Sequence, residues 1–548
     1  MVDTTGSSSF GAAPIAIAAA LTLSACDSGS SGGMTGATTQ SPATATPAAA
    51  VAPVGITQVQ ASRFLAQATM GATRSEISKV QSLGYEGWLN SQMSMPRAIT
   101  HLDWMVGNSA NTAITFDNSM WRQLISEPDQ LRQRVGMALL EIMVVGFAGV
   151  DLSWRQYAMA AYVDILLDNA FGNYRTLLEK ISTNAAMGSF LTFLNNRKAN
   201  PTTGAQPDEN YARELMQLFT IGVYKLNIDG TRQLSGGLPI ETYSQTDVSQ
   251  LAQVFTGLVL DTTDTTTPER YKRPLVANAS LHETGASSFL GTTVPAGTAT
   301  MDAIGIALDG IFANPNVPPF ISKQLIQRLV TSNPSPAYVG RVAAVFADNG
   351  SGVRGDLKAV IKAILLDSEA RGDVALTATT TGKLREPVMR FTAWARACEV
   401  TSPSNVWAIG DTTYSIGQAL GRSGSVFNFF RPGYSPPGTA ITNAGLVAPE
   451  FQLVSEVWTV AYVNYMTYVI DKGVADLTPD YSNLIAIASD AQALTDNVNM
   501  LLAAGQLGAS AVSTIRSAVA SVSASNTTQR VQIALVLTLA APEFLTIK

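Results

Sequence analysis

The sequence predicts a mainly α-helical protein: a large multi-helix body with short β-hairpins and long loops, preceded by a disordered N-terminal tether. Three observations support this class. Capped segments with apolar residues at helical spacing recur from Thr57 to the C-terminus. Hydrophobic residues make up 46% of the 548 residues and charged residues only 14%, so a large core can be buried. Residues 27–55 are mostly Ser, Gly, Thr, Ala and Pro, a composition that cannot bury a core.

Residues 1–25 are expected to be a lipoprotein-type signal peptide. Ala12–Leu23 is an apolar run that is too short to span a bilayer. It leads into Leu23-Ser24-Ala25-Cys26, which resembles a bacterial lipobox, so Cys26 is the expected lipidation site. The alternative is an ordinary signal peptide with a chance cysteine. The stretch before the apolar run departs from the signal pattern, because it has no Lys or Arg and carries Asp3. Residues 26–55 would then be a Ser/Thr/Ala/Pro-rich tether that holds the body, residues 57–548, off a membrane.

The first part of the body is expected to be a series of helices. They are a segment from Thr57, Arg74–Leu83 capped by Thr73, Trp88–Met93, Asp129–Val145, Trp154–Ala170 and Tyr174–Ile181. Asp129–Val145 is predicted to be a buried core helix and not a membrane span, because Arg132, Arg134 and Glu141 interrupt it. His101 is expected in a loop.

The stretch Pro207–Gly222 is predicted to be an amphipathic helix. Asp208 is the expected N-terminal cap, Glu209 lies in the first turn, and Gly222 ends the helix in a left-handed turn. The polar residues of one face are Glu209, Asn210, Arg213, Glu214 and Gln217, and the opposite face carries Tyr211, Leu215, Leu218 and Phe219. Two interpretations stay open: a solvated face with an ordinary ion pair, or a polar cluster that lines a cleft and binds a ligand or metal.

The rest of the body alternates irregular stretches and helices. Lys225–Thr231 is expected to be a hairpin-like turn, and residues 258–300, rich in Thr, Ser and Gly, are expected to be irregular with short strands. The predicted helices are Val248–Gly257 capped by Thr246 or Asp247, Ala303–Ala313, Pro318–Val330, Pro336–Ala347, Leu357–Ser368, one from Pro387, a polar stretch near 490–524, and Val531–Ala540. Residues 423–438 form an aromatic loop with three prolines, and ordered loops of this length are often functional.

Several function classes are disfavoured by composition. The net charge of −6 gives no electrostatic case for nucleic-acid binding. Only two histidines occur, which argues against a multi-His metal centre, and no Glu-x-x-His pair, nucleophile elbow or P-loop is present. No metal site is therefore predicted. The two cysteines exclude a disulfide framework, and Cys398 is most simply a small core residue.

His282, followed by Glu283, is the strongest single catalytic candidate, because a histidine in a Gly-rich loop can titrate near neutral pH. The alternative is a loop histidine that is hydrogen-bonded for structure. A second set of residues could join the polar face in one cleft, where arginine pairs would bind carboxylate or phosphate: Arg385, Glu386, Asn428 and Arg431. The alternative for this set is buried ion pairs that pin helix ends and the aromatic loop to the body.

Motifs along the chain resemble one known family. The most specific is Pro207-Asp208-Glu209-Asn210-Tyr211-Ala212-Arg213-Glu214 followed by Leu218-Phe219-Thr220-Ile221-Gly222. The others, in chain order, are Arg63-Phe64-Leu65 with Ala68-Thr69-Met70-Gly71, Asn169-Ala170-Phe171-Gly172-Asn173-Tyr174, Asp247-Val248 with Phe255-Thr256-Gly257, Leu384-Arg385-Glu386-Pro387, Ser425-Val426-Phe427-Asn428-Phe429-Phe430-Arg431-Pro432, Ala448-Pro449-Glu450-Phe451-Gln452, and Ala541-Pro542-Glu543-Phe544-Leu545. Over roughly residues 57–548 the chain is similar to the bacterial family called domain of unknown function 1800.

The resemblance implies a mostly helical, exported bacterial protein and supplies no established activity. Members are often encoded beside a protein of a second uncharacterised family that resembles sulfatases and alkaline phosphatases, which implies a possible partner. Two positions depart from the family pattern: Asn184 stands where members often have a histidine, and Ser287 and Ser288 stand where they often have a lysine. If either family residue were catalytic, this chain would be a weakened or inactive member.

Two functional hypotheses follow. The first is a lipid-anchored envelope protein that binds or assembles with a partner, possibly the phosphatase- or sulfatase-like one. The second is an envelope hydrolase that uses Glu209, Glu214 and His282 on a polymer or phosphorylated substrate. We favour the first, because no nucleophile–base or metal constellation is recognisable.

Overall fold

The computed structural model describes residues 55–109 and 111–548. The predicted signal peptide, Cys26 and nearly all of the predicted tether lie outside these residues. The described chain is mainly helical, and its strands form only short antiparallel pairs, which confirms the predicted fold class. Gly55–Lys548 is one compact unit. Within the described residues, no helix is both long enough and apolar enough to cross a membrane.

The first helices surround a buried centre. They are α1 (Gln58–Ala68), α2 (Arg74–Ser94), α3 (His101–Gly107), α4 (Ala113–Ser126), α5 (Gln130–Ile142), η1 (Phe147–Gly149), α6 (Arg155–Asp168), α7 (Tyr174–Ser182) and α8 (Ala185–Phe190). Every residue of α5 except Arg132 is buried, and α5 packs against α2, α6 and the later helix α12 (Val317–Leu329). The predicted core helix is thereby confirmed.

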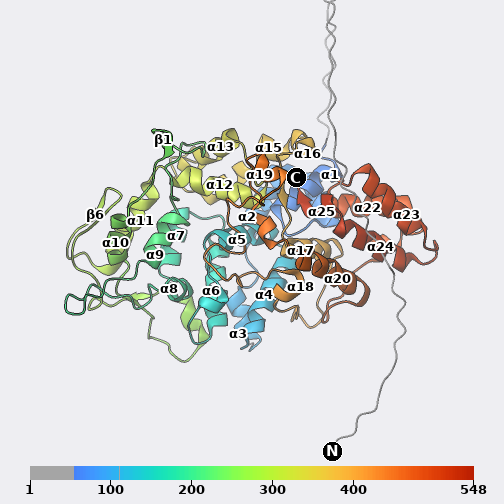
Figure 1. The fold of residues 1–548 in the computed structure, drawn as a ribbon. Coiled ribbons are helices and arrows are strands. Elements are labelled where there is room, and N and C mark those ends of the chain that lie inside the picture. Colours follow the sequence, from blue (N-terminus) through green and yellow to red (C-terminus); the bar gives the residue numbers. More distant parts are fainter. Residues whose placement is uncertain (1–54, 110) are drawn as a thin grey trace, which may run out of the picture. The chain divides into compact units, whose positions relative to one another are not determined.

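The middle of the chain holds the short strands. Its elements are α9 (Asn210–Gln217), β1 (Leu234–Ser235), β2 (Leu238–Pro239), α10 (Gln245–Val254), β3 (Leu258–Val259), η2 (Pro268–Lys272), β4 (Val276–Ala277), β5 (Ser287–Phe289), β6 (Thr292–Val294), α11 (Thr300–Ala313), α12 (Val317–Leu329), α13 (Pro336–Ala347) and α14 (Leu357–Leu366). β1 pairs with β2, β3 with β4, and β5 with β6, all antiparallel. In Figure 1, α7, α9, α10 and α11 gather at one side of the body.

The last part of the chain returns to the first. Its elements are α15 (Ser368–Arg371), α16 (Val374–Thr377), β7 (Lys383–Leu384), α17 (Pro387–Ala397), α18 (Thr413–Ile416), α19 (Ala440–Asn443), η3 (Pro449–Leu453), α20 (Glu456–Lys472), α21 (Ser482–Ile485), α22 (Ala491–Ala503), α23 (Ala509–Ala520), α24 (Thr527–Ala540), α25 (Pro542–Leu545) and β8 (Thr546–Ile547). α22 packs against α1, and Figure 1 shows the red C-terminal helices at the side opposite α10. β8 pairs with β7, and Arg63 Nε donates to the Lys548 carbonyl at 2.9 Å.

Local capping explains where helices begin. The Thr57 side chain accepts from the Gln60 amide, and the Gln60 side chain accepts from the Thr57 amide, which forms a capping box. Thr73 caps α2 as predicted, and α2 bends at Gly84, whose φ of 73° suits glycine. Cys398 is buried and free, as expected of a core residue.

Three local predictions are wrong. His101 does not lie in a loop but opens α3 and is buried, because the Thr100 side chain caps this helix at Asp103. The cap of α10 is Ser244, and neither Thr246 nor Asp247; Asp247 instead completes a capping box with Ser244. Glu209, and not Asp208, is the N-cap of α9, so Glu209 does not lie in the first turn, and the helix ends at Gln217, before Gly222.

Candidate functional site

The polar face of α9 is tied to α10. Glu209 and Arg213 form an ion pair at 3.0 Å, and the Ser249 hydroxyl and Gln245 amide donate to the Glu209 carboxylate at 2.6 and 2.7 Å. These bonds and the Arg213 charge hold the pKa of Glu209 below its usual range. Arg213 also donates to Gln245 Oε1 at 3.0 Å. The cluster therefore links two helices. Asn210 is exposed at the start of α9, and its backbone amide donates to Asp208 Oδ1.

Glu214 does not lie on an exposed face. It is buried, and its Oε2 has no hydrogen-bond partner among the described residues. Burial raises the pKa of this carboxyl group, and nearby Arg213 only partly offsets the effect. Because α10 packs against α9 on this side, the predicted polar arc is divided between a helix contact and a buried acid.

His282 is buried and bonded to the end of α10. Its Nδ1 lies 2.9 Å from the Thr256 carbonyl oxygen and 3.2 Å from the Thr256 hydroxyl. Donation to the carbonyl leaves Nε2 as the proton acceptor of the neutral ring. No hydrogen bond or ion pair joins His282 to Glu209 or Glu214 in the described part of the chain.

Glu386 belongs to a different place, a buried charge cluster in the core. The cluster consists of Arg134, Glu141, Arg328, Lys383, Glu386 and Glu450, all buried. Lys383 Nζ lies 3.0 Å from Glu450 Oε1 and 3.6 Å from Glu386 Oε1, and it donates to the Arg328 carbonyl at 2.7 Å. The Lys383 and Glu386 side chains have an exposed fraction of 0%, so this ion pair is cut off from water.

Two carboxyl groups of the buried charge cluster influence one another electrostatically. Both carboxylate oxygens of Glu141 and Oε1 of Glu386 have no hydrogen-bond partner among the described residues. Burial and the neighbouring Glu386 raise the pKa of Glu141 well above its ordinary value. Burial opposes the charge of Glu386, but Lys383 and the Gln418 amide, which donates to Glu386 at 2.6 Å, hold its pKa below the usual range. Burial and Glu386 thus favour the protonated form of Glu141, and Lys383 favours the charged form of Glu386.

In the described chain, no hydrogen bond or ion pair joins the remaining predicted binding residues to α9. Arg385 is buried over the Phe544 ring at 4.3 Å, and burial lowers its pKa to about 10. Arg431 lies over the Phe427 ring at 4.8 Å, within the aromatic loop. Asn428 has a left-handed backbone with φ of 57°, and its buried Nδ2 has no partner among the described residues. The single cleft expected for these residues and Glu209, Arg213 and Glu214 is not formed by shared bonds.

A groove of about 1070 Å³ lies between family motifs. Its walls come from the end of the α9 motif, the 224–232 turn, α12 and the aromatic loop, and include Gln217, Gly222, Tyr224, Arg232, Phe320, Lys323, Gln324, Phe427 and Pro432. Ser332 lines the groove and donates to Glu450 Oε2 at 3.5 Å, so the groove borders the buried charge cluster.

Two cations, Lys323 and Arg232, and two carboxylates, Asp229 and Glu369, line the groove. Burial and the nearby Arg232 lower the pKa of Lys323. Neither cation has a carboxylate partner in the described chain; Arg232 lies over the Tyr224 ring at 4.8 Å. Neither carboxylate is paired with these two cations: Glu369 forms an ion pair with Arg341 at 3.2 Å, and Asp229 accepts from Thr231. The groove therefore offers free positive charge next to aromatic surface.

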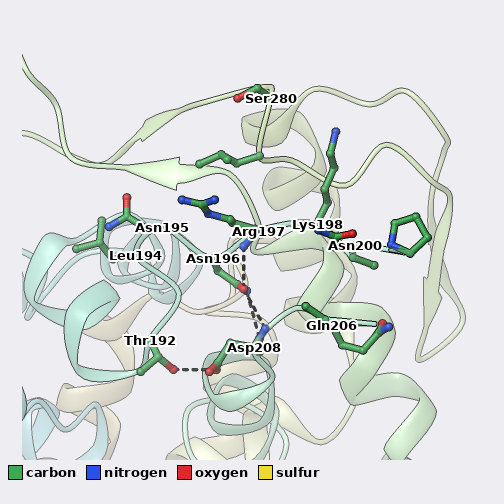
Figure 2. Close-up of a pocket in the computed structure, with 14 residues that line it drawn as sticks. Thr192, Leu194, Asn195, Asn196, Arg197, Lys198, Asn200, Gln206, Asp208 and Ser280 are labelled. Atoms are coloured by element: carbon green, nitrogen blue, oxygen red, sulfur yellow. Dashed lines mark hydrogen bonds between the residues drawn. The ribbon is translucent and has the colours of Figure 1, made fainter. Parts of the chain in front are cut away.

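A second, polar pocket lies beside the start of α9 (Figure 2). It has a volume of about 720 Å³, and its polar lining residues are Thr192, Asn195, Asn196, Arg197, Lys198, Asn200, Gln206, Asp208 and Ser280. In Figure 2 the Thr192–Asp208 and Asn196–Asp208 hydrogen bonds lie at one end, and Arg197 and Lys198 lie between them and Ser280.

Asn196 holds this polar pocket together. Its Oδ1 accepts from the Asp208 amide at 2.9 Å and the Arg197 amide at 3.0 Å. Its Nδ2 donates to the carbonyls of Asp208 at 3.2 Å and Phe255 at 3.3 Å. All four hydrogen-bonding positions of the side chain are used, so this buried amide fixes the start of α9 relative to the end of α10.

Replacing Asn196 with alanine is expected to lower the free energy of unfolding by about 2–3 kcal/mol, because several buried backbone groups lose their partner. Denaturant unfolding at neutral pH measures the change. Asn210→Ala is the matched control, since its exposed side chain makes no hydrogen bond in the described structure, and we expect a change within about 0.5 kcal/mol. Equal losses in both variants would contradict the role of Asn196.

Several of these site residues were not predicted from the sequence. Arg197 and Lys198 follow two asparagines, and this amide-basic run is a weak signal for a polar pocket. Lys383 and Glu450 stand within or beside family motifs, but nothing local indicates that they meet. Asn184, at a position where the family pattern differs, caps α8 by accepting from the amides of Ala186 and Met187.

The comparisons with known proteins identify a family. A family model described as "Protein of unknown function (DUF1800)" matches residues 63–546. The match covers most of the chain, so the chain belongs to this family, and the resemblance seen in its motifs is confirmed. No curated protein and no solved structure matches the chain.

Proposed function

We propose that the chain is a lipid-anchored envelope protein that binds a partner through the groove, and that the partner presents an acidic segment. The observation that carries the proposal is the pair of cations, Lys323 and Arg232, which lack carboxylate partners where family motifs meet. A carboxylate from a partner would relieve their mutual repulsion, and the aromatic walls would cover its apolar side chains.

Apolar surface next to the groove supports a protein as partner. The 223–242 segment, which forms one wall, exposes 59% of Leu234 and 72% of Leu238. Exposed apolar side chains beside a charged groove are typical of protein-binding surfaces. A phosphatase- or sulfatase-like envelope protein is the first candidate, and lipid anchoring at Cys26 would keep both proteins at one membrane.

The hydrolase alternative has one supporting observation. Donation from His282 Nδ1 to the Thr256 carbonyl would leave Nε2 free to act as a base. Against it, no hydroxyl, thiol or carboxylate in the described structure is hydrogen-bonded to that nitrogen, and Glu209 is engaged with Ser249 and Gln245. Partner binding is therefore the better-supported function.

The test is a pull-down of the full mature chain, Cys26 to Lys548, from its own envelope extract. The wild type is expected to capture a stoichiometric partner, which is identified, purified and titrated. Arg232→Gln with Lys323→Gln is expected to weaken the complex about ten- to a hundredfold, because two charge-assisted contacts are lost. The affinity of the wild type should also fall with added salt.

Lys180→Gln with Lys358→Gln is the matched control. Both lysines are exposed and unpaired in the described structure, and their removal changes the net charge equally. The control is expected to bind like the wild type, and all variants are compared by thermal unfolding first. Capture of the same partner with equal affinity by the groove variant would refute the proposal.

A further inference from the structure

We infer that the polar pocket beside α9 binds a sugar-sized polyol that carries an oxyanion, a site separate from the groove and independent of the proposed partner. A volume of about 720 Å³ lies within the range of small-molecule sites. The lining mixes two cations with amides and hydroxyls, which are the groups that bind anionic and hydroxylated parts of one ligand.

The positive charge of the polar pocket is free. Arg197 and Lys198 are exposed, and no ion pair or side-chain hydrogen bond engages either in the described part of the chain. A phosphoryl or carboxylate group placed between them would make charge-assisted hydrogen bonds.

The rest of the lining suits hydroxyl groups. Asp208 Oδ1 accepts from the Thr192 hydroxyl and the Asn210 amide, whereas Oδ2 has no protein partner in the described structure. Gln206 and Asn195 also line the polar pocket, with amide groups able to donate and accept. A simple inorganic anion would leave these groups unused and would be repelled by Asp208.

The backbone of the polar pocket is strained where it meets this space. Thr192 has a φ of 60° and Asn195 a φ of 64°, both in the left-handed region. For a β-branched residue such as Thr192 this conformation is unfavourable by about 1 kcal/mol or more and persists only where surrounding contacts enforce it. The Thr192–Asp208 bond and the four bonds of Asn196 enforce it here, so the pocket is held in shape before a ligand arrives.

The experiment is calorimetric titration of the full chain with four probes: glucose 6-phosphate, glucuronate, glucose and inorganic phosphate. Glucose 6-phosphate or glucuronate is expected to bind with a Kd of about 1 mM or tighter, and glucose and phosphate at least about tenfold more weakly. Which of the two anionic sugars binds more tightly distinguishes a phosphorylated ligand from a carboxylated one.

Arg197→Ala with Lys198→Ala is expected to reduce binding of the anionic sugar at least about tenfold. Its melting temperature should stay unchanged, because neither side chain has a partner in the described structure. Lys180→Ala with Lys358→Ala is the control and is expected to bind like the wild type. No binding of either anionic sugar, equal binding of glucose or of phosphate, or full binding by the Arg197/Lys198 variant would each overturn the inference.

Discussion

Replacing Lys383 with methionine is expected to lower the free energy of unfolding by about 3–5 kcal/mol. Lys383 is the cation between Glu386 and Glu450, at 3.6 and 3.0 Å, and none of the three side chains reaches water appreciably. Removing the cation leaves a buried carboxylate without its counter-charge, and methionine has no donor for the Arg328 carbonyl. Urea unfolding at neutral pH, followed by circular dichroism, measures the loss.

Two further variants give this prediction its control. Lys358→Met changes an exposed lysine of α14, and we expect an effect within about 0.5 kcal/mol. Lys383→Met combined with Glu450→Gln removes the carboxylate closest to Lys383 and keeps Glu386 as the counter-charge of Arg134 and Arg328, so it should recover part of the loss. A Lys383→Met variant as stable as the wild type would show that the ion pairs make no net contribution.

The buried charge cluster could not be predicted from the sequence. Lys383 and Glu386 are close in the chain, but Glu141, Arg328 and Glu450 come from three other stretches. Each looks locally like an ordinary polar residue of a helix or loop. Only the tertiary packing of α5, α12, β7 and η3 brings them together, so their shared electrostatics leave no local pattern.

Local signals, in contrast, predicted most helices well. Thr57 and Thr73 cap the helices expected of them, since a cap depends on a few neighbouring residues. The sequence pattern predicts α20 only weakly, because apolar residues are spread around the whole helix. Val457 and Val460 are exposed, although other residues of the helix are buried. Such a helix shows no polar face from which it could be predicted.

The polar face of α9 shows the limit of periodicity for a site. Spacing placed Glu209, Arg213 and Glu214 on one arc, and the structure keeps Glu209 and Arg213 paired. Spacing does not reveal what packs against that arc, so the burial of Glu214 beneath its neighbours was not foreseen. The groove was missed for the same reason, because it is lined by segments distant in sequence, whereas the polar pocket is lined mostly by one loop, residues 192–208, with Ser280 and Leu281.

Replacing Glu141 with glutamine is expected to stabilise the protein increasingly as the pH rises from 4 to 8. The pKa of Glu141 is raised well above the ordinary value of 4.5 in the folded state, by burial and by Glu386. Between these two pKa values the folded chain binds more protons than the unfolded chain, so the stability of the wild type falls with rising pH. Glutamine mimics the protonated acid and removes that loss, by about 1.4 kcal/mol for each unit of pKa shift crossed.

Glu386→Gln is the matched comparison, and the opposite sign is expected. The pKa of Glu386 is lowered in the folded state, chiefly because Lys383 outweighs the effect of burial. The charged carboxylate therefore stabilises the folded state above the ordinary pKa, and this stabilisation is lost as the pH falls through the folded-state pKa. This variant should therefore be less stable than the wild type at pH 8 by an amount that stays nearly constant down to the ordinary pKa of 4.5, and the difference should shrink as the pH falls further. Urea midpoints from about pH 3 to pH 8, measured for both variants, decide the assignment. Destabilisation of Glu141→Gln at pH 8 would mean that Glu141 carries the charge and Glu386 the proton, whereas a stabilisation by Glu141→Gln that grows above pH 4.5, with a destabilisation by Glu386→Gln that shrinks below it, would establish Glu141 as the protonated member of the pair.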